Sequence, residues 1–78
     1  MKVFMCKRAG GYSGGLAVVA ANTREEAWDV FHHNGENEYM ISTSGDSYYY
    51  PRRDWFEVPI LTADTIVPMI IAEGGYSE

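Results

Sequence analysis

A chain of 78 residues is long enough for one domain and too short for two, so residues 1–78 are predicted to form a single compact unit. Eleven acidic residues against six basic ones give a net charge of −5, which opposes general binding to the phosphate backbone of DNA or RNA. The single cysteine excludes an internal disulfide, so association into a homo-oligomer is the expected supplement to a thin core.

The N-terminal segment predicts a β-hairpin. Lys2 to Arg8 (KVFMCKR) carries apolar residues on both sides of an extended chain, which indicates a central strand covered on both faces. Cys6 lies among apolar neighbours and is expected to be a buried, unreactive thiol. Leu16 to Ala21 (LAVVAA) predicts a second strand, antiparallel to the first.

A helix is predicted to follow from about Arg24 to His33. Thr23 is placed to cap it by accepting a hydrogen bond from the Glu26 amide, and Glu26 is expected to reach back to the Thr23 amide. Asn34-Gly35 provides a natural end. The buried stripe of this helix is predicted to comprise Ala27, Val30 and Phe31, with Trp28 at its margin.

The C-terminal half predicts four more strands. Tyr39 to Thr43 and Ser47 to Tyr50 flank a turn at Ser44-Gly45-Asp46, and Trp55 to Val58 and Met69 to Ala72 are shorter. The resulting order predicts an α+β fold in which an antiparallel β-sheet of about four to six strands carries one α-helix packed on a face.

The stretch AGGYSGGL, from Ala9 to Leu16, has two interpretations. Glycine tolerates the backbone angles that a hairpin connection requires. Glycine also leaves backbone amides bare, so that the N–H groups of Gly11 and Gly14 and the Ser13 hydroxyl are candidates to surround an anion. The spacing matches neither the dinucleotide fingerprint nor the Walker phosphate loop, and both interpretations remain open.

The segment YYYPRRDW, from Tyr48 to Trp55, also has two interpretations. Arg52 and Arg53 can grip a phosphate in a forked geometry, and aromatic rings can stack on a nucleobase. Alternatively the tyrosines pack along an edge strand, the arginines pair with Asp54 or Glu57, and Trp55 fills the core.

These two segments define a candidate ligand site if they converge. Lys7 and Arg8 come directly before the glycine loop and add a second cation pair. Tyr12, Tyr50 and Trp55 are the candidates for stacking on a base. The first functional hypothesis is therefore a non-enzymatic protein that binds a small phosphorylated ligand such as a nucleotide.

Catalytic and metal sites are not predicted. His32 and His33 are adjacent on a helix and point about 100° apart, so they cannot share a metal, and their place at the helix C-terminus suits the helix dipole. Neither a catalytic triad nor a cofactor motif is present, so no cofactor is expected.

Acidic side chains around the predicted helix support an alternative function. A protein–protein inhibitor could present such a surface to the basic groove of a host enzyme, although a solvated helix face explains the same residues. These residues are Glu25, Glu26, Asp29, Glu36 and Glu38.

The segments YSGG, VVAANTREEA and PMIIAEGGY resemble small uncharacterised proteins encoded by bacteriophages and prophages. This resemblance implies interference with a host system, either by sequestering a signalling nucleotide or by blocking a defence enzyme. The N-terminus lacks the pattern of a signal peptide, and the longest apolar run, Leu16 to Ala21, is too short to cross a bilayer. We therefore expect a protein of the host bacterial cytoplasm, without membrane partners.

Overall fold

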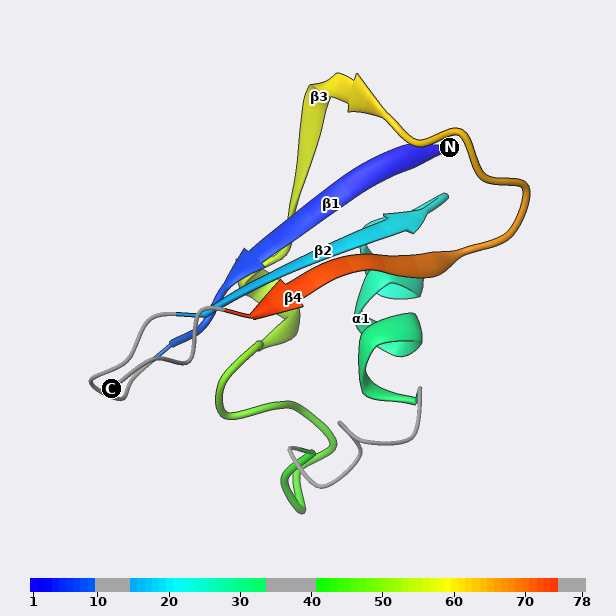
Figure 1. Cartoon of the computed structure of the whole chain (residues 1–78). Helices are drawn as coiled ribbons and strands as arrows, with labels where there is room; N and C mark the ends of the chain where they lie inside the picture. The colour runs from blue at the N-terminus through cyan, green and yellow to red at the C-terminus, as the bar shows by residue number, and fades with distance from the viewer. Residues whose placement is uncertain (10–14, 34–40, 75–78) are drawn as a thin grey trace.

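The computed structural model describes residues 1–9, 15–33 and 41–74, and these form two layers (Figure 1). One layer is an antiparallel four-stranded sheet in the order β3-β1-β2-β4, and the other contains the helix α1. The predicted α+β class, with one helix on one face of an antiparallel sheet, is confirmed. The elements are β1 (Lys2–Lys7), β2 (Leu16–Ala21), α1 (Arg24–His32), a short 3₁₀ helix (Arg52–Asp54), β3 (Phe56–Thr62) and β4 (Met69–Gly74).

Strands β1 and β2 form the predicted hairpin at the centre of the sheet. They pair without interruption from Lys2↔Ala21 to Lys7↔Leu16. The prediction that the first strand is a central one is confirmed, because β3 pairs with its other edge. Cys6 is fully buried, and burial raises the pKa of its thiol to about 12, with the charge of Asp54 adding to the effect. The predicted burial of this thiol is therefore confirmed, and the raised pKa keeps it protonated near pH 7.

The two outer strands pair irregularly with the centre. The register between β1 and β3 shifts between Lys2 and Phe4, and that between β2 and β4 shifts between Val18 and Val19. The predicted end of β3 at Val58 is wrong, since the strand runs through Pro59 to Thr62. An edge strand can contain proline, because the N–H that proline lacks would face away from the sheet.

Helix α1 begins at the predicted cap. The Thr23 hydroxyl accepts a hydrogen bond from the Glu26 amide at 3.1 Å. The reciprocal contact is one residue earlier than predicted, because Glu26 Oε1 accepts from the Asn22 amide at 2.7 Å and from Asn22 Nδ2 at 3.0 Å. The first turn of the helix is thus tied to Asn22, the residue that follows β2.

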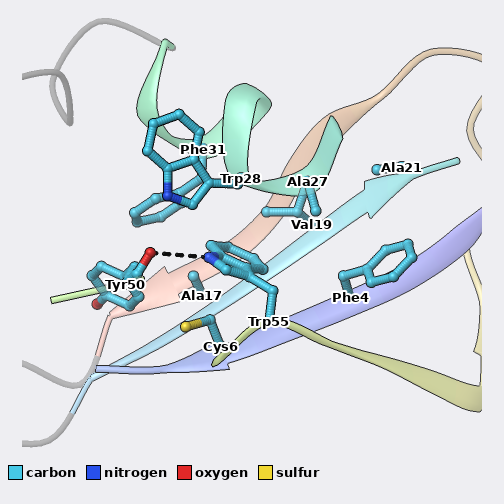
Figure 2. Packing of buried hydrophobic residues seen from close by; sticks show 10 residues of the cluster. All are labelled: Phe4, Cys6, Ala17, Val19, Ala21, Ala27, Trp28, Phe31, Tyr50 and Trp55. Carbon is cyan, nitrogen blue, oxygen red and sulfur yellow. Dashed lines mark hydrogen bonds between the residues drawn. The ribbon is translucent and has the colours of Figure 1, made fainter. Parts of the chain in front are cut away.

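The hydrophobic core lies between α1 and the sheet face beneath it (Figure 2). Trp28 is 2% exposed, so its predicted place at the margin of the buried stripe is wrong. His32 is also completely buried, whereas Val30 is only partly buried. The core cluster comprises Phe4, Cys6, Ala17, Val19, Ala21, Ala27, Trp28, Phe31, Tyr50 and Trp55.

The segment 41–50 contains no strand, which corrects the two strands predicted there. A single bridge joins Ile41 to Ser47 around the expected turn, in which the Gly45 amide donates to the Ser42 carbonyl at 2.9 Å. Gly45 has a φ of 86°, a conformation that side chains disfavour. The part of the first predicted strand before Ile41 lies outside the described residues.

Candidate functional site

A partly exposed corner forms where β1 ends and the Tyr48–Tyr50 run passes beside it. The Ala9 amide donates to the Tyr49 carbonyl at 2.7 Å, and the Arg8 amide donates to the Gly15 carbonyl at 2.9 Å. The guanidinium of Arg8 lies over the Tyr49 ring, 4.2 Å from its centroid. Lys7 is exposed, but the alternation of side chains along β1 places it on the face of the sheet opposite Arg8, which lies on the same face as Tyr50. The structure therefore brings Arg8, and not Lys7, to the tyrosine run.

Gly15 fits this corner because it has no side chain. A Cβ added there would lie 2.9 Å from both Cβ and Cδ of Arg8 and 3.0 Å from the Tyr50 hydroxyl. These are distances that real Cβ atoms do not adopt without movement of their neighbours. Gly15 thus allows the Arg8 side chain to lie close against the backbone at the start of β2.

Asp46 holds the start of the YYYPRRDW segment in place. Its Oδ1 accepts from the Ser47 amide at 2.8 Å and from the Arg52 amide at 3.0 Å. Burial acts to raise the pKa of Asp46, but these two amides and the Arg52 charge outweigh it, so the pKa lies below its ordinary value. The Trp28 indole N–H also lowers the pKa of Asp46 to a smaller extent, although it is not positioned to form a hydrogen bond.

Arg52 is directed toward the helix. Its guanidinium lies 3.8 Å from the centroid of the Trp28 ring, and its Nε lies 3.7 Å from Glu25 Oε2. Arg53 has 87% of its side chain exposed and lies 3.9 Å from Asp54. Arg53 therefore pairs with Asp54, one of the two partners that the sequence suggested for the arginines. Arg52 instead pairs with Glu25 on the helix.

Tyr50 and Trp55 are core residues. Tyr50 is completely buried and Trp55 is 1% exposed. The Trp55 indole donates to the Tyr50 carbonyl at 3.1 Å, and the Phe31 ring packs against both (Figure 2). Neither ring presents a face to solvent. The Tyr49 ring, by contrast, contacts the Arg8 guanidinium at the corner.

The residues predicted to line the middle of the loop, Gly11, Tyr12, Ser13 and Gly14, lie outside the described residues. Sequence reasoning did not single out Tyr49, because nothing local separates it from Tyr48 and Tyr50. The Ala9–Tyr49 hydrogen bond that selects it joins residues far apart in the chain.

His32 is a buried polar group in the aromatic cluster. Its Nδ1 lies 2.9 Å from the Trp28 carbonyl and donates to it, while Nε2 has no hydrogen-bond partner. Burial lowers the pKa of His32, with smaller contributions from neighbouring groups. The imidazole is therefore neutral near pH 7, so it does not supply the favourable charge expected for the helix C-terminus.

The described part of the chain adds no metal site and no membrane-spanning helix. Across residues 1–9, 15–33 and 41–74, no group of three or more His, Cys, Asp or Glu side chains could hold a metal ion. The same ranges contain no helix with the length and apolar character that a membrane span requires. Comparisons with known proteins find no matching family, no matching curated protein and no matching solved structure.

Proposed function

We propose that this protein is a non-enzymatic binder of a small phosphorylated ligand, and that the corner formed by Arg8, Gly15 and Tyr49 binds the phosphate. The observation that carries the proposal is the stacking of the Arg8 guanidinium on the Tyr49 ring at the end of β1. A guanidinium whose plane is fixed by an aromatic ring loses little conformational freedom when its edge donates to phosphate oxygens.

The composition of this corner also supports the proposal. Arg8 places a positive charge at this corner, although the chain as a whole has a net charge of −5. Local positive charge within an acidic protein favours a small anion over a long polyanion, because a polyanion would also meet the repulsive acidic surface. Arg52 is not part of this proposed site, because its guanidinium is directed toward α1, over the Trp28 ring and beside Glu25.

The ligand class that we propose is a nucleotide signal that the protein sequesters without altering it. The resemblance to small phage proteins supports this biological context, in which removal of a host signal suppresses a defence response. Homo-oligomerisation is part of the proposal, because a thin monomer offers little depth for a ligand pocket.

Calorimetric titration with nucleoside mono-, di- and triphosphates and inorganic pyrophosphate tests the proposal. At least one compound is expected to bind, to be recovered chemically unchanged, and to bind Arg8→Ala about 10- to 100-fold more weakly, because a charge-assisted contact is lost. Arg53→Ala removes an exposed cation elsewhere and is expected to bind like the wild type. Absence of binding across the panel, or equal losses in both variants, would contradict the proposed site.

A protein partner bound by α1 is the second candidate function. Glu25 and Asp29 lie one turn apart, with 67% and 64% of their side chains exposed. If this surface is the functional one, charge reversal at both positions abolishes capture of a host protein and leaves the nucleotide titrations unchanged.

A further inference from the structure

The proposed phosphate site is built around a single guanidinium group. Arg8 lies over the Tyr49 ring, 4.2 Å from its centroid, and its side chain runs close along the backbone of Gly15, where an added Cβ would lie 2.9 Å from its Cδ. The Nε atom of Arg8 is buried, so a ligand reaches the guanidinium through its two terminal nitrogens. The N–H groups on that edge form a rigid fork, which matches two oxygens of one phosphate.

Three of the other cations lie away from this fork. Lys7 is on the opposite face of the sheet, because side chains alternate along β1. Lys2 is the first residue of β1 and lies at the other end of that strand from Arg8. Arg24 is the first residue of α1, which follows the end of β2 that pairs with Lys2.

The two remaining cations are paired with acids. The Nε atom of Arg52 lies 3.7 Å from Glu25 Oε2, and that of Arg53 lies 3.9 Å from Asp54 Oδ1, so neither pair adds net charge. The residues outside the described ranges contain no lysine or arginine. The corner therefore offers a ligand one side-chain cation and one fork of donors.

One cation and one fork match the chemistry of a phosphodiester. A diester has two unesterified oxygens and one negative charge, so a single guanidinium can engage both oxygens and neutralise the charge. A phosphomonoester has a third unesterified oxygen and a charge of about −1.5 to −2 at pH 7. The excess charge would approach a chain of net charge −5 without a cation to meet it, and its partial desolvation at the corner would weaken binding.

We propose that the ligand of this corner is a small phosphodiester with one negative charge, bound in preference to a phosphomonoester or a polyphosphate. This assignment rests on the proposed function and narrows its ligand class. Nucleic acids are also phosphodiesters, but the net charge of −5 opposes a long polyanion. A nucleotide diester and a lipid head group share the proposed chemistry.

Calorimetric titration with AMP and with its methyl phosphodiester tests the preference, because the two compounds share a base, a sugar and one phosphorus atom. At about pH 7.5 the methyl ester is expected to bind about 10-fold more tightly, since AMP carries charge that the corner does not neutralise. Arg8→Ala is expected to weaken the binding of both compounds.

The pH dependence of the same pair supplies a second readout. Between about pH 7.5 and pH 5.5 a phosphomonoester takes up its second proton, with a pKa of about 6, and becomes a monoanion. The affinity for AMP is therefore expected to rise on acidification toward that of the methyl ester. The affinity for the methyl ester should stay constant, and it controls for any effect of pH on the protein.

Glycerophosphoglycerol, a lipid head group with the same monoanionic diester and no base, identifies the source of the ligand. Tighter binding of this compound than of the AMP methyl ester would support the diester and indicate a lipid source, and the reverse order would indicate a nucleotide. AMP that binds at least as tightly as its methyl ester, with both weakened by Arg8→Ala, would overturn the diester preference and leave the phosphate site standing. Absence of binding by all three compounds, or binding that Arg8→Ala does not change, would contradict the site itself.

Discussion

Trp55→Ala is expected to lower the free energy of unfolding by about 4 kcal/mol, a large part of the roughly 4 to 12 kcal/mol available to a domain of this size. The indole is 1% exposed and packs against Phe31 and Tyr50, with ring centroids 5.6 and 6.4 Å away. Its removal leaves a cavity and also leaves the Tyr50 carbonyl without the indole donor. Urea unfolding followed by circular dichroism, at one protein concentration, measures the loss.

Two variants control for this effect. Trp55→Phe retains most of the packing and removes the indole donor, so it is expected to lose clearly less stability than Trp55→Ala. Tyr48→Ala truncates a side chain that is 76% exposed and should change stability by about 0.5 kcal/mol or less. A small effect of Trp55→Ala would contradict the placement of YYYPRRDW against the core.

Stability is expected to fall as the pH decreases from 7 to 5 because His32 is buried as a neutral ring. Burial lowers the pKa of His32 in the folded protein, whereas in the unfolded chain it titrates near its ordinary value of about 6.5. Below that pH the unfolded state takes up a proton that the folded state resists. Stability from this residue is therefore present above about pH 6.5 and is lost on acidification, by up to about 1.4 kcal/mol per pH unit.

Paired histidine variants isolate this contribution. His32→Asn should flatten the dependence of the unfolding free energy on pH between 7 and 5, whereas His33→Asn, at an exposed position, should leave it unchanged. Asp46 does not interfere, because its folded pKa is lowered and the stability that it provides is lost only below about pH 4. An unaltered slope in His32→Asn would show that the pKa of this imidazole is the same in the folded and unfolded states.

Local sequence signals predicted the N-terminal half of the fold well. The β1–β2 hairpin and the Thr23 cap depend on neighbours in sequence, so alternation and capping rules apply directly. The rules were less accurate for Glu26, because the Asn22 amide and side chain offer two donors where the Thr23 amide offers one. They also misplaced Trp28, whose burial depends on the segment that packs beside α1.

The tyrosine run shows why the C-terminal half was harder to predict. Aromatic residues favour strands, and in a strand Tyr48 and Tyr50 would share a face. Instead Tyr48 is 76% exposed and Tyr50 is completely buried, because hydrogen bonds to Asp46 and Ser47 fold the segment into irregular turns. These hydrogen bonds are local. Whether they form in place of strand pairing depends on whether the rest of the chain offers this segment a partner strand.

The sequence could indicate which residues belong to the candidate site, but not how their side chains contact one another. Basic and aromatic residues can be counted in the sequence, whereas the direction of each side chain depends on tertiary contacts. Arg8 meets Tyr49 because a hydrogen bond joins Ala9 to the tyrosine run, and Arg52 meets Trp28 because the 3₁₀ helix lies beside α1. No local sequence pattern predicts that Arg8 contacts Tyr49 while Arg52 contacts Trp28.

Titration of ¹⁵N-labelled protein with the tightest compound of the phosphate panel, followed by amide chemical shifts, tests the proposed function most directly. The corner model predicts the largest shifts at the amides of Arg8, Gly15 and Tyr49, with α1 unaffected. Shifts centred on the exposed acids of α1, or no shifts with any compound, would contradict it.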